Sequence, residues 1–159
     1  MDSTVVFSGL VEEDSFALET ALLAVADLMT RDVVTIDADR PLADAISLFN
    51  ERGFRHLVVV DEARVAGVLS DRSALRALVR NPDAQATAVR VAMTKDPITI
   101  RPHATVSEAI HLLLTNRINC LPVVVDGGSV SGILTTTDLL RAQFSLQRWL
   151  ESRGRRLSS

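Results

Sequence analysis

The sequence predicts a mixed α+β (α/β) protein built from two similar halves. Residues 28–36, LMTRDVVTI, match residues 92–100, AMTKDPITI, at five of nine positions when the chain is displaced by 64 residues. After one inserted residue, a displacement of 65 pairs GVLS at 67–70 with GILT at 132–135. In each half, short β-branched runs alternate with segments of helical periodicity. An internal duplication with one order of elements explains all three observations.

Each half is expected to run strand, helix, strand, strand, helix. In the first half, Gly53 follows the first helix at a position where a left-handed residue is favoured, and Asn81 and Pro82 end the second helix. The expected strands are 33–36, 57–60 and 65–69, and the expected helices are 41–52 and 71–80.

The second half repeats this order, and an additional helix that begins at Ser15 is expected before the first half. Thr105 and Glu108 have the spacing of a capping box, and Asp126 to Gly128 supply a turn between strands at 121–125 and 130–134. The last helix is expected from Asp138. The expected domains are an N-terminal arm and helix (1–25), a first repeat (26–82), a linker (83–90), a second repeat (91–146) and a helix end with a tail (147–159).

Each repeat is expected to form a small three-stranded mixed sheet with two helices. Strands this short cannot hide both faces of a sheet alone, so the halves should pack sheet against sheet with pseudo-two-fold symmetry. A cleft is then expected where the two repeats meet.

Composition excludes several classes of function. The formal net charge of −3 over 159 residues gives no electrostatic basis for nucleic-acid binding. No apolar run is long enough to span a bilayer, and a single cysteine, Cys120, cannot form an internal disulfide, so a cytoplasmic location without membrane insertion is expected. The three histidines and Cys120 lack metal-site spacing, and no nucleophile and base form a pair, so neither a metal site nor an enzyme is expected.

The segment GILTTTD at 132–138 carries the most chemistry. A backbone that turns here from strand to helix would direct free N–H groups, Thr135, Thr137 and Asp138 at one small volume, which suits a phosphate and a ribose. Thr135 and Asp138 also fit a capping box, a purely structural role that the residues alone leave open.

Together, the openings MTRDVVTI and MTKDPITI, the RHLVVVD and CLPVVVD strands, and the GVLS and GILT segments resemble a tandem pair of CBS domains, a Bateman module. The resemblance covers residues 26–144. It implies a regulator that binds AMP, ADP, ATP or S-adenosylmethionine between its repeats and requires no cofactor. It also implies a homodimer formed through the helices and an unidentified protein effector that is regulated in trans.

The family's ligand motif is matched in full by Gly132, Thr135 and Asp138. By resemblance, Asp138 would hold the ribose hydroxyls, whereas Thr135 and Thr137 would face phosphate. In the first repeat Ser70 keeps the hydroxyl, but Ser73 stands at the aspartate position, so one ribose site is expected. The remaining residues implied are Ile118, Asn119, Pro122, Ile98 and Ile100 on the adenine side, and Arg55 and His56 near phosphate.

The altered first motif supports an alternative from a different class. In that alternative the chain is a ligand-independent dimerisation or protein-interaction module with degenerate clefts.

Overall fold

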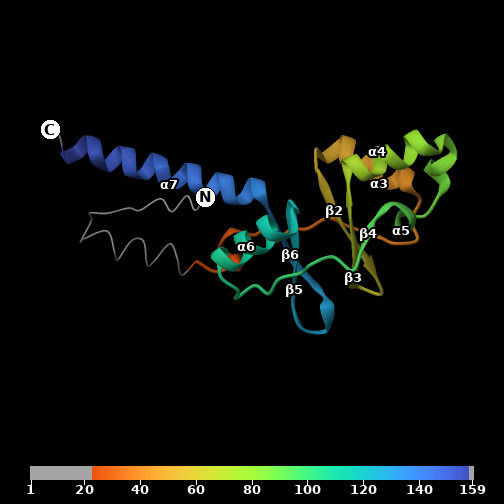
Figure 1. Ribbon diagram of the computed structural model, residues 1–159, viewed down its shortest axis with the longest axis horizontal. Helices are drawn as coiled ribbons and strands as arrows, with labels where there is room; N and C mark the ends of the chain where they lie inside the picture. The colour runs from red at the N-terminus through yellow and green to blue at the C-terminus, as the bar shows by residue number, and fades with distance from the viewer. Residues whose placement is uncertain (1–22, 158–159) are drawn as a thin grey trace.

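The computed structural model describes residues 23–157 as two lobes side by side, with a long C-terminal helix projecting from the second (Figure 1). Most of the predicted N-terminal arm and helix lies outside the described residues. None of the helices within 23–157 combines the length and apolar character needed to cross a bilayer.

The first lobe contains a four-stranded sheet in the order β1-β2-β3-β4, with helices α3 and α4 on it. The β1 and β2 strands are parallel, with Ile36 opposite Val59, and β2 and β3 form an antiparallel hairpin. The element bounds are β1 Thr35–Asp37, α3 Leu42–Arg52, β2 His56–Asp61, β3 Arg64–Ser70, α4 Asp71–Arg80 and β4 Thr94–Lys95.

The second lobe repeats this plan with a smaller sheet. Its hairpin consists of β5 (Cys120–Val124) and β6 (Val130–Thr135), flanked by α6 (Val106–Asn116) and α7 (Thr136–Leu157). The counterpart of β1 is reduced to a single parallel bridge between Ile100 and Val123. The predicted mixed α+β class is confirmed, although the two expected three-stranded sheets appear as one of four strands and one of two.

The strand count differs because the repeats exchange their opening segments. The β4 strand belongs to the second repeat in sequence but pairs with Gly67 and Val68 of β3. In the opposite direction, Thr30 of the first repeat exchanges two backbone hydrogen bonds with Ile133 of β6, at 2.9 and 3.0 Å. Each sheet is therefore completed by chain from the other repeat.

Two four-residue helices extend this exchange into the cores. Helix α2 (Val25–Leu28) places Val25 in the second core, and α5 (Val89–Ala92) places Val89 in the first. The backbone bonds that anchor them are equivalent at the 64-residue displacement, from Val25 N to the Ala104 oxygen and from Val89 N to the Arg40 oxygen, each 2.8 Å. The region expected to be a linker thus contains the 3-10 helix η1 (Pro82–Ala86) and the start of a core element.

Three apolar clusters hold the lobes together. The first is centred on Leu57 and Leu69 and the second on Leu121 and Leu134, all four fully buried. The third lies between the lobes and joins Val58, Cys120 and Ile133. Since this cluster draws on β2, β5 and β6, the two hairpins pack against each other, and the predicted pseudo-two-fold arrangement is confirmed.

The turns of the two repeats use different residues at equivalent places. Gly53 ends α3 in the left-handed region with φ of 67°, and Arg117 ends α6 there with φ of 54°. The second hairpin turns through the 3-10 segment η2 (Asp126–Gly128), where Gly127 and Gly128 have φ of 77° and 82°. The first hairpin places Glu62 and Ala63 at positive φ instead. Such backbone costs a residue with a Cβ roughly 1–2 kcal/mol.

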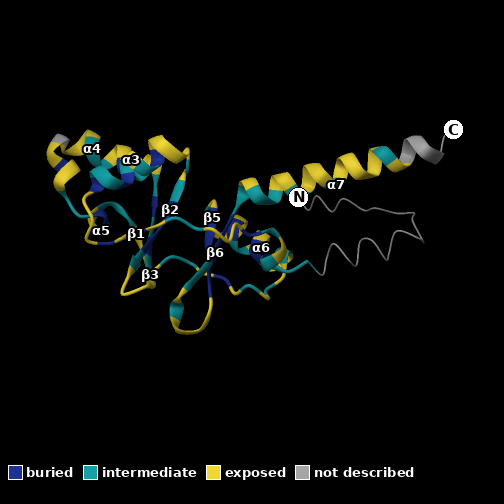
Figure 2. Ribbon diagram, turned by 180° about the vertical axis from the view of Figure 1, so that it is seen from behind, coloured by how far each residue is buried: buried dark blue, intermediate teal, exposed yellow. Residues whose placement is uncertain are grey.

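Apolar side chains remain exposed on the helices. Figure 2 shows α7 running largely exposed away from the second lobe. Leu140 and Phe144 on α7 are exposed, as are their repeat equivalents Leu75 and Val79 on α4, and Leu114 on α6. Each of these helices thus exposes apolar side chains to solvent.

Candidate functional site

The candidate site is a cleft of about 730 Å³ between the two repeats. The first repeat lines it with its opening segment at 30 and 32–34 and with residues 52–56, which join α3 to β2. The second repeat contributes Asn119 and Ile133 around its hairpin, residues 135–138 at the β6–α7 junction, and Arg141. A molecule bound here would contact both repeats.

The β6–α7 junction forms the capping arrangement that its sequence allows. Asp138 Oδ2 accepts hydrogen bonds from Thr135 N at 2.8 Å and from Thr135 Oγ1 at 2.7 Å, and Asp138 N lies 3.3 Å from Thr135 Oγ1. No described residue donates a hydrogen bond to the second carboxylate oxygen of Asp138, Oδ1. Capping the helix therefore uses Asp138 Oδ2, and Oδ1 remains able to accept a hydrogen bond from a ligand hydroxyl.

The first repeat keeps the cap without that spare oxygen. Ser70 Oγ accepts from Ser73 N at 3.0 Å and lies 2.9 Å from Ser73 Oγ, which reproduces the contact between Thr135 and Asp138. Asp71 Oδ1 instead accepts from the adjacent Arg72 N at 2.7 Å. A serine hydroxyl is thus sufficient to begin α4, whereas the carboxylate of the second repeat offers more acceptors than the helix uses.

The wall contributed by the first repeat carries the basic groups Arg52, Arg55 and His56. Burial lowers the pKa of the His56 imidazole, an effect opposed by the charge of Asp71 and reinforced by that of Arg55. Around neutral pH the imidazole is therefore mostly uncharged, whereas both guanidinium groups are charged.

The structure brings six of the eleven predicted site residues together in this cleft: Asn119, Thr135, Thr137, Asp138, Arg55 and His56. The other five lie elsewhere. Ser70 caps α4, Pro122 is fully buried within β5, and Ile98 and Ile118 pack against the second core. Ile100 is buried in that core and lines a different cavity.

The cleft is also lined by four residues that were not predicted as site residues: Thr30, Asp32, Arg52 and Arg141. The opening segment reaches it because Thr30 pairs with Ile133 of the other repeat, and no local periodicity reports such an exchange. One signal was present, since the MTRD and MTKD openings are the best-matched part of the duplication.

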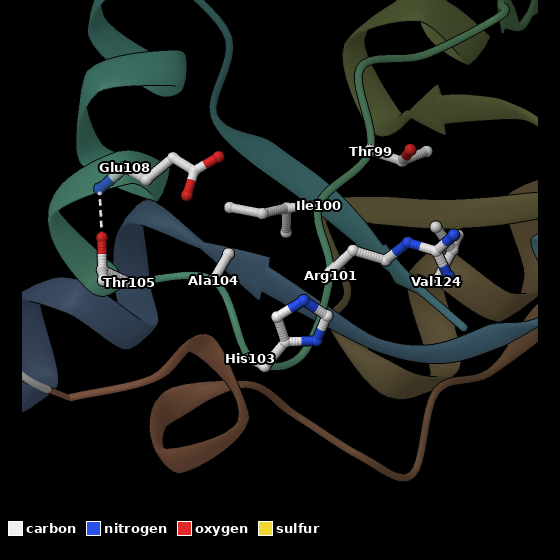
Figure 3. Close-up of a pocket in the computed structure, with 8 residues that line it drawn as sticks. All are labelled: Thr99, Ile100, Arg101, His103, Ala104, Thr105, Glu108 and Val124. Atoms are coloured by element: carbon white, nitrogen blue, oxygen red, sulfur yellow. Dashed lines mark hydrogen bonds between the residues drawn. The ribbon is translucent and has the colours of Figure 1, made fainter. Parts of the chain in front are cut away.

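A second cavity, of about 390 Å³, lies at the start of α6 (Figure 3). There Glu108 N donates to Thr105 Oγ1 at 3.1 Å, and Arg101 pairs with Asp126 at 3.2 Å. Its charged side chains are exposed, and Ile100 is the one predicted site residue that it contains.

Cys120 is buried in the apolar cluster between the lobes and does not line the cleft. Burial raises the pKa of the Cys120 thiol to about 11, so the thiol stays protonated, packed beside Val58 and Ile133. Within the described part of the chain, no three His, Cys, Asp or Glu side chains are grouped so that they could hold a metal ion.

Comparison with known proteins identifies the repeats. The CBS domain family model matches the chain twice, over residues 25–80 and 88–145. The CBS domain-containing protein YhcV of Bacillus subtilis is 30% identical over 123 residues, which cover 77% of this chain and 86% of YhcV. The crystal structure of CBSX2 in complex with AMP superposes with a TM-score of 0.70 at 27% identity, covering 78% of this chain and 98% of CBSX2.

The same module occurs within larger enzymes. Inosine-5'-monophosphate dehydrogenase of Methanocaldococcus jannaschii is 28% identical over 132 residues, which are 82% of this chain but 26% of the dehydrogenase. The chain thus spans about a quarter of the length of this relative.

Proposed function

Because the chain belongs to the CBS domain family, we propose that it is a regulatory module that senses an adenosine-containing ligand, namely AMP, ADP, ATP or S-adenosylmethionine, in the cleft between its repeats. One observation carries the proposal: Thr135, Thr137 and Asp138 of one repeat line the same cleft as Arg55 and His56 of the other. The AMP complex of CBSX2, a structural relative above 25% identity, supports the choice of ligand class.

In this proposal the roles of the residues follow from their chemistry. The free oxygen of Asp138 accepts a hydrogen bond from a ribose hydroxyl, and the Thr137 hydroxyl donates to a phosphate oxygen. The Thr135 hydroxyl, which already donates to Asp138 Oδ2, holds that carboxylate in place. Arg55 and His56 approach the phosphate from the first repeat. Asn119 lies beside the β6–α7 junction, where Thr136 N donates to its backbone oxygen at 3.0 Å, and its side chain borders the base.

A ligand held by both repeats can carry a signal. Ligand binding favours whichever arrangement of the repeats binds it more tightly, and only that difference in affinity can be transmitted. We propose that the readout is made by a protein effector in trans, in the cytoplasm, without a catalytic step in this module and without a required cofactor.

We also propose that the module acts as a homodimer assembled through its helices. Support comes from the exposed apolar side chains at equivalent positions of the two repeats, Leu75 and Val79 on α4 and Leu140 and Phe144 on α7. Burial of such side chains is the main driving force of association.

A thermal-shift panel with AMP, ADP, ATP and S-adenosylmethionine tests the ligand proposal. A ligand at about 100 times its Kd adds about 2.7 kcal/mol, which for a chain of this size raises Tm by about 5–10 °C. Asp138→Ala should abolish the shift and Ser73→Ala should keep it. No shift with any of the four compounds would overturn the sensing proposal.

The ligand-independent assembly module remains the second candidate, favoured by one observation. Asp138 already caps the start of α7, and in the first repeat Ser73 fills the equivalent capping position without a carboxylate. Mass spectrometry of the purified, denatured protein discriminates between the candidates, because a retained adenosine compound is expected only from a sensor.

A further inference from the structure

Helix α7 continues well beyond the lobe against which it begins. Leu139 in its first turn packs against the second core, and β6 and α2 contact the helix. Its outer half runs largely exposed away from the lobe (Figure 2). From Leu139, helical spacing of three or four residues continues through an apolar stripe, here called the outer face of α7: Ala142, Leu146, Trp149 and Leu150.

This outer face is separate from the side of α7 that is proposed for dimerisation. Phe144 and Leu146 are two residues apart, which corresponds to about 200° of rotation around an α-helix. The side chains of Trp149 and Leu150 are 38% and 45% exposed. The outer face therefore still offers apolar area to a partner when Phe144 lies in a dimer interface.

The outer half of α7 is also basic. Residues 145–157 contain four arginines and one glutamate. Arg153 follows Trp149 by four residues, and its guanidinium carbon lies 4.5 Å from the centre of the indole ring. Among the ion pairs formed within residues 23–157, none involves Arg148 or Arg153. An apolar stripe with arginines along it suits a partner that is both apolar and acidic.

Residues 1–22 of the same chain have this complementary chemistry. They contain no lysine or arginine and five carboxylates, those of Asp2, Glu12, Glu13, Asp14 and Glu19. Half of the 22 residues are apolar, so the segment has a large apolar area whose burial is favourable.

The described chain begins close to α7. The backbone oxygen of Leu23 accepts a hydrogen bond from Val106 N at 2.9 Å, and α2, which starts two residues later, contacts α7. The outer face from Ala142 to Leu150 is about 12 Å long at 1.5 Å per residue, and the expected helix over residues 15–22 would match that length. Residues 1–22 can therefore reach the whole outer face from Leu23.

We propose that residues 1–22 pack along the outer face of α7 of their own chain. Their apolar side chains lie against Leu146, Trp149 and Leu150, and their carboxylates lie towards the arginines of the outer half. This contact needs no ligand in the cleft. It makes the acidic segment the occupant of the part of α7 that the two lobes leave exposed.

Paramagnetic relaxation measured by NMR on the full chain tests this contact, because the single tryptophan gives one indole N–H signal. A nitroxide label on Ser8→Cys or Ser15→Cys should broaden the Trp149 signal, and reducing the nitroxide should restore it. Ser129→Cys is the matched control, since Ser129 is exposed at the end of β6 remote from α7, and its label should leave the signal sharp. If neither Ser8→Cys nor Ser15→Cys broadens the signal, the proposal is wrong.

The same signal tests the role of charge. Combining Glu12→Gln with Glu13→Gln should reduce the broadening at low ionic strength, where charges are least screened. Glu51→Gln removes an exposed carboxylate from α3 in the first lobe and should not reduce it. Broadening that the paired change leaves intact would overturn the proposed charge pairing.

A mixed sample tests whether the contact lies within one chain. Isotope-labelled parent chains are combined with spin-labelled chains of natural isotope composition, so that only a contact between copies can broaden the Trp149 signal. The signal should stay sharp. Broadening in the mixed sample would assign residues 1–22 to α7 of a second copy and would overturn the proposal.

Discussion

Gly132 lies against Met29 so closely that a Cβ on the glycine would fall 2.6 Å from the methionine sulfur and 3.0 Å from the Thr30 carbonyl oxygen. Gly67 stands in the same relation to Met93, whose sulfur would lie 2.5 Å from an added Cβ. Each glycine therefore gives the opening segment of the other repeat room to pair with its strand. Gly132, the glycine of the ligand motif, is therefore also needed for the pairing between the repeats, next to the ligand site.

Gly132→Ala should lower the free energy of unfolding by about 3 kcal/mol, because a backbone oxygen on a paired segment cannot move aside cheaply. Urea denaturation measures the loss. Gly53→Ala is the control, since its Cβ would meet no atom within 4 Å and the cost of about 1 kcal/mol comes from positive φ alone. A Gly132→Ala loss no larger than that of Gly53→Ala would contradict this account.

How far the sequence predicts the fold depends on how local each signal is. Residues 71–80 were predicted as a helix and form α4 with the same bounds, because the Ser70 cap and the Asn81–Pro82 stop are local. Helix α5 was not predicted, since four residues show no periodicity, whereas α2 lies at the end of the helix that was predicted from Ser15. Val89 lies in the region predicted to be a linker, and the apolar pattern around Val25 does not indicate which repeat buries it, so the exchange was not predicted.

The same distinction holds for the candidate site. Thr135 and Asp138 were predicted together because one turn of chain contains both. Asp32 and Arg141 approach them only through the exchanged segment and the course of α7, which depend on tertiary packing.

Asp138→Ser should separate the cap from the ligand site, because it copies the pairing of Ser70 with Ser73 into the second repeat. Stability should stay within about 1 kcal/mol of the parent protein, whereas Asp138→Ala should lose about 1 kcal/mol more through the missing cap partner. Thermal denaturation checks stability, and the shift produced by AMP should disappear in both variants. A preserved AMP shift in Asp138→Ser would show that the carboxylate does not hold the ribose.

Ala63→Gly should stabilise the protein by about 1 kcal/mol, since the first hairpin places Ala63 at φ of 64° where the second has Gly128. Chemical denaturation of the variant and of Gly128→Ala makes a matched pair with opposite expected signs. Equal stability of the parent and Ala63→Gly would mean that the turn relaxes without cost.

His56 should make stability depend on pH. Because its pKa is lower in the folded protein than the usual 6.5, the unfolded chain binds more protons in the interval between the two values. The contribution of the neutral imidazole is complete above pH 6.5 and is lost as pH falls below it. Denaturation at about pH 7.5 and about pH 5.5 should show a smaller loss in His56→Gln than in the parent protein, and equal losses would argue against the assignment.

Val79→Glu should convert the proposed homodimer into monomers, because it places a charge among the exposed apolar side chains proposed to form the dimer interface. Val79 is 77% exposed in the single chain, and Val91 on α5 is 71% exposed, so Val91→Glu is a control of matched exposure. Sedimentation velocity measures the masses. A dimer that survives Val79→Glu would place the interface elsewhere.

The exchanged opening segments bear on the ancestry of the chain. A single repeat taken alone would have an open sheet edge at Gly67 or Gly132 and a core without its Val89 or Val25. Two separate copies could complete each other only by trading these segments, which is domain swapping. The tandem chain thus has the geometry of a swapped dimer fused into one polypeptide. Cutting it between the repeats would produce partners that must find each other again rather than two independent domains.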